Sequence, residues 1–256
     1  MKILCSDYDG TLSHGGITAE KLNAIRAWRT AGNKFGIISG RRASFYWDLK
    51  AAQPDLELDF MATCNGAVVL DGDGRILTEA RCTDVPTEEI VKDLLSRGST
   101  LVFLNGIDGD PFDYLCVVKK IEDRPDWVAA DHTVSVDELP AIKSFHQITP
   151  VTDTPEEAIP LEEQIRACYG DSLNPLRNGR CIDAVPLGIN KAEGVRRIAS
   201  HFGANHADMI TVGDNINDAD MLREFRSYAM ESGTEYAKSI AGRTVADVTD
   251  IFEIEG

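Results

Sequence analysis

Two aspartates near the N-terminus, Asp7 and Asp9, end a short apolar segment in the run DYDGT. Alternate residues of a strand project to the same face, so both carboxylates are expected at one side of a strand end. Two carboxylates in one pocket repel each other, and a bound divalent cation is the usual remedy. Oxygen ligands favour a hard cation such as Mg²⁺. Asp-x-Asp-Gly is also a common polar turn, so this run alone leaves a structural interpretation open.

A second polar cluster lies near the other end of the chain, in the run GDNINDAD. Asp214 follows the apolar segment MITVG, and Asn215, Asn217 and Asp218 come before the next predicted helix. Carboxylates and amides at this density are typical of a ligand or cation site when they stand at the carboxyl end of a strand. The alternative is a helix N-cap by Asp218 with incidental polar neighbours.

Two further positions could hold an anion. Ser39 and Gly40 lie between a predicted strand and a helix expected to begin at Arg41, where free amides and a hydroxyl can bind an anion. Such a pair is also frequent at an ordinary helix start. Lys191 opens another predicted helix, where the helix dipole disfavours a cation unless an anionic group lies nearby. Taken alone, Lys191 is interpreted as a surface lysine.

The hydrophobic pattern places these residues at strand ends. In the first and last thirds, strands are predicted at KILCSDYD, KFGIISG, FMATC, AVVL and MITVGD, with a turn at Asn65-Gly66. Helices are predicted near residues 18–31, 41–51, 191–202, 218–225, 234–241 and in VTDIFEI. This alternation indicates a parallel sheet. From about residue 81 to 187 the rhythm changes to that of an α+β insert, with helices at 87–96 and after Pro155 and strands at LVFLNG, YLCVVKK, AIKSFHQIT and RCIDAVP.

The four signals together resemble the haloacid dehalogenase superfamily, specifically its Cof-type sugar-phosphate phosphatases with a large inserted cap. The matching runs are DYDGTL at 7–12, ISGR at 38–41, Lys191 and GDNIND at 213–218, in the order of the family. The Asn65-Gly66-Ala67 turn is similar too. The resemblance implies an α/β fold in which residues 1–81 and 188–256 form a Rossmann-like catalytic core. Residues 82–187 would form an α/β cap that determines substrate specificity.

The resemblance also implies catalytic and metal-binding roles. Asp7 would be the nucleophile that accepts the phosphoryl group, and Asp9 the general acid that later activates water. Mg²⁺ would be bound by Asp7, by the backbone carbonyl of Asp9 and by Asp214. Asp218 would support this metal site without binding the ion directly.

For the phosphate and the substrate, the resemblance implies a separate set of groups. Ser39 and the backbone amides of Tyr8 and Gly40 would hold the phosphate, Lys191 would neutralise it, and Asn217 would help to position the substrate. Two departures from the family pattern affect the surroundings of these groups: AMESGTEYAK replaces a common Gly-Asn-Ala turn, and Tyr8 replaces an aliphatic residue.

The expected function is Mg²⁺-dependent hydrolysis of a small phosphorylated metabolite, a sugar phosphate by this resemblance, through an aspartyl-phosphate intermediate. A phosphomutase or phosphotransferase on the same scaffold is the first alternative, because Asp9 does not distinguish water from a sugar hydroxyl as acceptor. A non-catalytic phosphometabolite-binding protein is the second. The cap sequence carries no motif that identifies the substrate.

Composition limits the partners and the compartment. The 256 residues carry a formal net charge of −16, which opposes binding to nucleic acid. No apolar run approaches the roughly 20 residues of a membrane helix, and MKILCSDYDG does not have the pattern of a secretory signal. The six cysteines show no metal-binding or disulfide spacing and are predicted to be reduced and mostly buried. A cytoplasmic monomer is expected.

Overall fold

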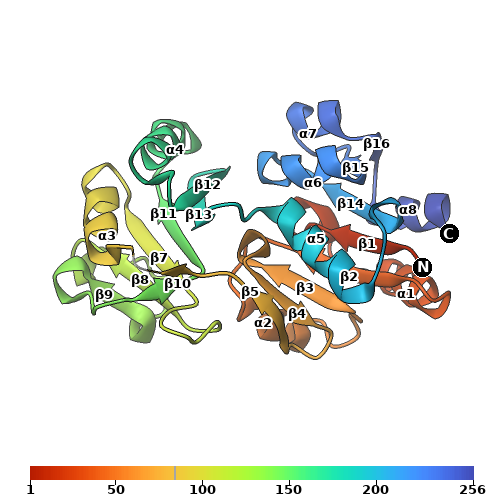
Figure 1. Cartoon of the computed structure of the whole chain (residues 1–256), viewed down its shortest axis with the longest axis horizontal. Helices are drawn as coiled ribbons and strands as arrows, with labels where there is room; N and C mark the ends of the chain where they lie inside the picture. The colour runs from red at the N-terminus through yellow and green to blue at the C-terminus, as the bar shows by residue number, and fades with distance from the viewer. Residues whose placement is uncertain (84) are drawn as a thin grey trace. The chain divides into compact units, whose positions relative to one another are not determined.

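The computed structural model describes residues 1–83 and 85–256, and the chain forms two compact units (Figure 1). The first unit contains Met1–Arg41, Phe45–Glu79 and Asn190–Gly256, and the second contains Arg42–Ser44 and Ala80–Ile189. The second unit is therefore almost entirely an insertion into the first. Its predicted role as a substrate-specificity cap stays a prediction.

The first unit is built on one eight-stranded sheet, in the order β16-β15-β14-β1-β2-β3-β4-β5. Neighbouring strands from β16 to β3 run parallel, and β4 and β5 are antiparallel. The α/β prediction is confirmed. The strands are β1 (Ile3–Ser6), β2 (Lys34–Ile38), β3 (Phe60–Thr63), β4 (Val68–Asp71), β5 (Ile76–Glu79), β14 (Met209–Gly213), β15 (Arg226–Met230) and β16 (Arg243–Val245).

Helices cover both faces of this sheet. Apolar side chains of α5 and α6 join one buried cluster with residues of β1, β2, β3 and β14. On the other face, the ring of Phe252 in α8 lies 5.8 Å from Phe35 of β2 and 5.6 Å from Trp28 of α1. The helices are α1 (Ala19–Thr30), α2 (Phe45–Ala52), α5 (Lys191–Phe202), α6 (Ala219–Glu224), α7 (Glu235–Ile240) and α8 (Val248–Glu255).

The Asn65-Gly66 turn joins β3 to β4 as an antiparallel hairpin, as predicted, with Thr63 opposite Val68. Gly66 has a φ of 95°, which L side chains rarely adopt. A Cβ at Gly66 would lie 2.6 Å from the backbone oxygen of Asn190 and 3.0 Å from the Cα of Gly194. The turn therefore packs directly against the first turn of α5, the helix that begins with Lys191.

The helix predicted from Arg41 begins four residues later, at Phe45. The backbone oxygen of Arg41 accepts a hydrogen bond from the amide of Cys64 at 2.8 Å, so it does not accept one from a helical amide. The amide of Arg41 in turn donates to the Ser39 hydroxyl at 3.1 Å. Ser39 and Gly40 thus precede an irregular segment and not a helix N-terminus, which corrects the prediction.

The second unit has a six-stranded sheet in the order β12-β13-β11-β7-β8-β9. Two helices, α3 (Thr87–Ser96) and α4 (Pro155–Tyr169), pack their apolar sides against one face of it. The predicted α+β character of the insert is confirmed. The strands are β7 (Leu101–Asn105), β8 (Tyr114–Val118), β9 (Thr133–Ser135), β11 (Gln147–Val151), β12 (Leu173–Asn178) and β13 (Cys181–Pro186).

The strand predicted across AIKSFHQIT is divided into two. Phe145 ends β10 (Ser144–Phe145), which pairs with β6 (Cys82–Thr83), whereas Gln147 begins β11 beside β7. The backbone amide of His146, between them, donates to the oxygen of Asn105 at 2.8 Å. The chain therefore changes its pairing partner at His146.

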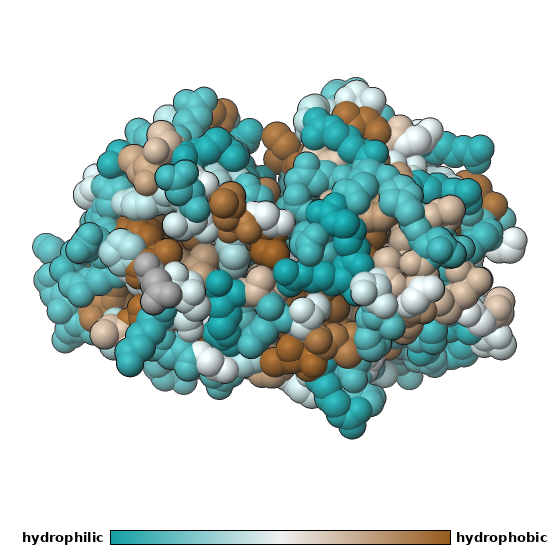
Figure 2. Space-filling view, viewed as in Figure 1, coloured by the Kyte–Doolittle hydropathy of each residue, from teal (hydrophilic) through white to brown (hydrophobic). Residues whose placement is uncertain are grey.

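All six cysteines are free thiols, four of them buried. No helix among the described residues has the length and apolar character needed to cross a membrane. Hydrophilic residues dominate the face shown in Figure 2, with apolar residues in small groups. Short 3-10 turns lie at Cys64–Gly66, Ile121–Asp123, Ala130–His132, Val136–Glu138, His206–Asp208 and Ile216–Asp218.

Candidate active site

The two predicted acidic clusters meet at one edge of the eight-stranded sheet. Asp7 directly follows β1 and Asp214 directly follows β14, and these parallel strands are neighbours with Ser6 opposite Val212. The amide of Asp7 continues the pairing by donating to the oxygen of Val212 at 2.9 Å. Both aspartates therefore stand at the carboxyl ends of adjacent strands, where α/β sheets bind their ligands.

Three carboxylates are close enough to share one ligand. One oxygen from each of Asp7, Asp214 and Asp218 lies within 4.8 Å of the others. Asp7 and Asp218 are buried, and Asp214 is half-buried. The hydroxyl of Thr11 donates to Asp214 at 2.9 Å and so fixes the orientation of this carboxylate.

Asp218 links the loop that carries Asp214 to Lys191. One of its oxygens accepts hydrogen bonds from the amides of Asp214 at 2.9 Å and Asn215 at 3.0 Å. The other accepts from the ammonium group of Lys191. Its side chain does not cap α6. Both oxygens are thus engaged by the protein, which agrees with a supporting position and not with the simple N-cap interpretation.

Lys191 is fully buried, so its interpretation as a surface lysine is wrong. Its Nζ lies 2.7 Å from an oxygen of Asp7 and also contacts Asp218. A buried ammonium group is costly unless carboxylates pair with it, and here two do. The carboxylates of Asp7 and Asp218 offset the unfavourable interaction between the helix dipole and the Lys191 cation.

Burial and mutual repulsion shift the pKa values of these groups. Burial raises the pKa of Asp7 well above its usual range; Lys191 opposes this shift and Asp218 adds to it. Burial also raises the pKa of Asp214, with repulsion by Asp218 contributing. For Lys191, burial acts to lower the pKa, but Asp218 and Asp7 raise it by more. Three carboxylates beside one ammonium group leave excess negative charge at this edge.

The donor set fits a hard divalent cation, because carboxylate oxygens are the ligands that Mg²⁺ and Ca²⁺ prefer. Burial is the main cause of the raised pKa of Asp7 and Asp214, and a cation would remove the repulsion between carboxylates that adds to it. The loop leaves room beside these oxygens only because residue 10 is glycine. Gly10 has a φ of 78°, and a Cβ there would lie 2.6 Å from Oδ2 of Asp214.

Asp9 is exposed and lies outside this carboxylate cluster. Its two oxygens accept hydrogen bonds from Nε and Nη2 of Arg41 at 2.8 and 2.6 Å. The Arg41 guanidinium also lies 4.4 Å from the ring centroid of Phe45 and 5.3 Å from that of Tyr8. This bidentate pair, backed by two aromatic rings, holds Asp9 in a defined orientation.

The remaining predicted residues surround the same strand ends. Ser39 is buried, and its hydroxyl accepts from the Arg41 amide, so Ser39 and Asp9 are linked through one residue. Tyr8 packs edge-on against Phe45, with ring centroids 4.9 Å apart. Asn217 is nearly buried, and within the described part of the chain its side-chain amide makes no hydrogen bond. Gly40 lies next to Ser39 at the end of β2.

The side-chain contacts of two residues in this geometry were not predicted from the sequence. Thr11 orients Asp214, and Arg41 orients Asp9. Both stand inside the runs that drew attention, DYDGTL and ISGR. Their residue types were visible, but their partners lie 203 and 32 positions away, so only the folded chain reveals the contacts.

Comparison with known proteins places this geometry in a family. The sequence model of haloacid dehalogenase-like hydrolases matches residues 4–250. The 5-amino-6-(5-phospho-D-ribitylamino)uracil phosphatase YbjI of Escherichia coli is 24% identical over 91% of this chain and 86% of its own length. An HMP-PP phosphatase of Yersinia pestis is 27% identical over 86% of this chain and 80% of its own.

Solved structures share the fold over the whole chain. The HAD subclass IIB sugar phosphatase BT4131 has a TM-score of 0.77 at 22% identity, covering 100% of this chain and 99% of its own. A haloacid dehalogenase-like hydrolase from B. subtilis has a TM-score of 0.78 at 17% identity, covering 99% of both chains.

This chain belongs to the haloacid dehalogenase-like hydrolase family. The predicted family and fold are confirmed. The prediction of a phosphatase is confirmed at the level of this family, since the chain is a hydrolase whose named relatives are phosphatases.

Proposed function

We propose that this hydrolase is a Mg²⁺-dependent phosphatase that removes the phosphate from a small sugar phosphate through an aspartyl-phosphate intermediate. One observation carries the proposal. The buried carboxylate of Asp7 lies at a strand end, 2.7 Å from the Lys191 ammonium group and within the reach of two further carboxylates. Phosphoryl transfer needs such an arrangement, because it depends on positioning and on neutralisation of spread negative charge.

In the first step, an oxygen of Asp7 attacks the phosphorus atom and the bond from phosphorus to the leaving oxygen breaks. Asp9 gives its proton to that oxygen, so the product leaves as an alcohol. Arg41 orients Asp9 for this transfer. Lys191 stays protonated beside Asp7 and neutralises part of the charge on the transferred group.

In the second step, water attacks the phosphorus atom of the aspartyl phosphate. Asp9, now ionised, takes a proton from this water, and the bond from phosphorus to the Asp7 oxygen breaks. Inorganic phosphate and the original carboxylate result. In both steps, we propose that the Ser39 hydroxyl and the backbone amides of Tyr8 and Gly40 donate hydrogen bonds to the phosphate group. The side-chain amide of Asn217, which has no hydrogen-bond partner among the described residues, is available to bind the substrate.

Asp7, Asp214 and the backbone carbonyl of Asp9 would hold the Mg²⁺ ion, with Asp218 fixing the loop that carries Asp214. When bound, the ion supplies positive charge at the phosphate oxygens and relieves repulsion among the carboxylates. The carboxylate donor set supports this assignment, because one oxygen from each of Asp7, Asp214 and Asp218 lies within 4.8 Å of the others.

For the substrate, the relatives give a chemical range. Their names include a phosphoribitylamino-uracil phosphatase, an HMP-PP phosphatase and a sugar phosphatase. Two of these names contain a sugar or sugar-alcohol phosphate, which supports a phosphorylated polyol or sugar here.

The test is phosphate release from a panel of sugar phosphates, phosphoribityl compounds and HMP-PP, with Mg²⁺ and with a chelator. We expect phosphate release that requires Mg²⁺ and that the Asp7→Asn substitution abolishes. The control variant is Asp73→Asn, which changes an exposed aspartate in the turn between β4 and β5 and should release phosphate normally. Acid quench with ³²P-labelled substrate should label the unaltered protein and not Asp7→Asn.

Two results would reject the proposal. Phosphate that reappears on a sugar product, with little free phosphate, would identify the mutase or transferase alternative. An absence of both turnover and labelling on every ester, in a protein that still binds the esters, would identify a binding protein.

A further inference from the structure

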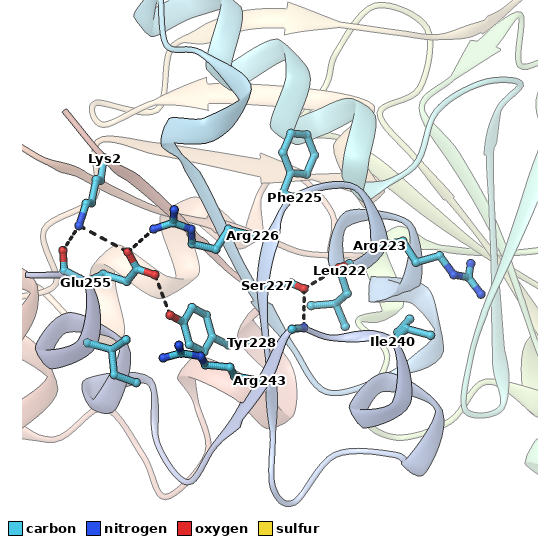
Figure 3. Close-up of a pocket in the computed structure, with 12 residues that line it drawn as sticks. Lys2, Leu222, Arg223, Phe225, Arg226, Ser227, Tyr228, Ile240, Arg243 and Glu255 are labelled. Carbon is cyan, nitrogen blue, oxygen red and sulfur yellow. Dashed lines mark hydrogen bonds and ion pairs between the residues drawn. The ribbon is translucent and has the colours of Figure 1, made fainter.

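A concave site lies in the same unit as the acidic cluster, at the opposite edge of the same sheet (Figure 3). It is a cavity of about 720 Å³, within the size range of small-molecule sites. Lys2 precedes β1, and Arg226 and Arg243 are the first residues of β15 and β16. Because a strand rises about 3.3 Å per residue, the backbones of Lys2 and Asp7 are roughly 16 Å apart.

One end of this cavity is cationic. Figure 3 shows that the side chains of Lys2, Arg226 and Arg243 gather around one carboxylate, Glu255, and the Tyr228 hydroxyl. Such a cluster of positive charges stands out in a chain whose net charge is −16. The opposite end of the cavity carries the apolar side chains of Leu222 and Ile240 beside Arg223, whose charge is paired with Asp220 at 3.9 Å.

Glu255 accounts for only part of this positive charge. It is buried, lies 3.4 Å from Lys2 and 2.8 Å from Arg226, and accepts the Tyr228 hydroxyl at 2.7 Å. Burial acts to raise the pKa of Glu255, but these donors lower it by more, so Glu255 is ionised at neutral pH. Glu255 pairs with Lys2 and Arg226, and Arg243 adds a third cation at this end, so the one carboxylate leaves two positive charges unbalanced.

Arg243 is the cation with no protein partner. Among the residues that the structure describes, its guanidinium makes no hydrogen bond or ion pair, and it lies next to the Tyr228 ring (Figure 3). A guanidinium group presents a planar fork of donors that matches phosphate oxygens. Arg226 and Lys2 are already oriented by Glu255, so the cationic end is preorganised around Arg243.

We propose that this cavity binds a phosphate monoester of up to nucleotide size, at a site separate from the acidic cluster. A phosphate monoester carries about −1.5 to −2 charges at pH 7, which matches the two unbalanced positive charges. A carboxylate would neutralise only one of them. The organic part of the ligand would lie against Leu222 and Ile240, at the apolar end.

The experiment is isothermal titration of AMP into the intact protein in EDTA, at fixed ionic strength, with adenosine as the ligand that lacks phosphate. We expect one saturable AMP site and much weaker binding of adenosine. Arg243→Gln should weaken AMP binding about ten-fold, the loss of one charge-assisted interaction. Arg75→Gln, an exposed arginine outside the cavity with the same change in charge, should leave it unaltered.

Four outcomes would overturn the proposal. In the first, the protein shows no saturable binding at millimolar AMP. In the second, Arg243→Gln and Arg75→Gln weaken AMP binding equally. In the third, Ser39→Ala abolishes AMP binding, and in the fourth, the protein binds acidic peptides or polyphosphate but not AMP. The third outcome would place AMP at the acidic edge, and the fourth would mean that the cavity binds a macromolecule and not a small phosphate ester. Because Arg243 has no protein partner, Arg243→Gln is expected to fold, and thermal unfolding checks this.

Discussion

At the scale of single residues, Arg41 contacts Asp9, the general acid of the proposed mechanism. Its guanidinium binds both oxygens of Asp9 and rests on the rings of Phe45 and Tyr8. An exposed carboxylate would otherwise sample many orientations, and a misplaced general acid loses much of its contribution to the rate. Arg41 is therefore a positioning residue in the proposed mechanism.

We expect Arg41→Met to slow the first chemical step about ten-fold or more for an alkyl phosphate, because proton transfer to that leaving oxygen needs an oriented acid. The same step with 4-nitrophenyl phosphate should change little, since nitrophenolate leaves without a proton. Single-turnover kinetics measure both. Equal losses with the two substrates, or a large loss of thermal stability, would show that Arg41 has a structural role instead.

At the scale of elements, the hairpin turn at Gly66 supports the helix that presents Lys191. The turn contacts the backbone of Asn190 and Gly194, so a side chain at Gly66 would push α5 away from the sheet. Gly98 is a matched control, because its φ is also positive, at 112°, but nothing lies within 4 Å of its Cβ position.

Gly66→Ala should lower the free energy of unfolding by about 3 kcal/mol, combining backbone strain with overpacking. Gly98→Ala should cost only the strain, about 1 kcal/mol. Urea unfolding of both variants gives the comparison. Similar losses in the two variants would mean that the close approach of the turn to α5 contributes nothing to stability.

Asp59 joins α1 to β2 at the start of β3. Its carboxylate accepts hydrogen bonds from Arg29 at 2.8 Å, Lys34 at 3.1 Å and the Phe35 amide at 3.0 Å. Burial acts to raise the pKa of Asp59, but Arg29, Phe35 and Lys34 lower it by more. Because the folded pKa lies below the unfolded value of about 3.9, this stabilisation is present above pH 4 and is lost as the pH falls through the folded pKa.

Asp59→Asn should therefore lower the free energy of unfolding by about 2 kcal/mol at pH 7. The difference from the unaltered protein should begin to shrink below pH 4, where the unfolded carboxyl takes up its proton, and should vanish only below the folded pKa, where the carboxyl is protonated in both states. Denaturant unfolding at pH 7 and pH 3 measures it, with Asp73→Asn, which is largely exposed, as the control. A difference that is equal at both pH values would contradict the ionic explanation.

The sequence predicted the buried elements better than the exposed ones. The strands before Asp7 and Asp214 are buried throughout and mostly apolar, and α5 begins and ends at the predicted residues. In contrast, β5 and β16 are short, and only Val245 of β16 is buried among their residues. Their side chains therefore carry no clear hydrophobic pattern, and neither strand was predicted. Hydrophobic periodicity reports burial, and an edge strand has little of it.

The site was predictable as far as residue types at strand ends could show it. Asp7, Ser39 and Asp214 stand out because polar groups follow apolar strands. Lys191 does not, since only tertiary contacts with Asp7 and Asp218 make it a buried cation. The orientation of Asp9 depends on the irregular segment after β2, where the Arg41 oxygen pairs with Cys64 in place of a helical amide.

At the scale of the whole molecule, charge is the dominant property. The chain carries a net charge of −16, and the face in Figure 2 is mainly hydrophilic. In the proposed mechanism, a phosphate ester that approaches the acidic edge is repelled by the net charge of the protein before Lys191 and the proposed cation attract it. Salt screens exposed charges over about 10 Å at 0.1 M, so it weakens the long-range repulsion more than the short-range attraction.

We therefore expect kcat/KM for a dianionic phosphate ester to rise two- to five-fold, as an order of magnitude, between 10 and 150 mM salt at saturating Mg²⁺. The kcat should stay nearly constant, because the long-range repulsion acts on the approach of the substrate and not on the substrate once it is bound. Steady-state kinetics over the salt series, repeated at two Mg²⁺ concentrations to exclude metal loss, measure this. A fall in kcat/KM with salt would mean that local positive charge governs approach to the site, and that the net charge of the chain acts elsewhere.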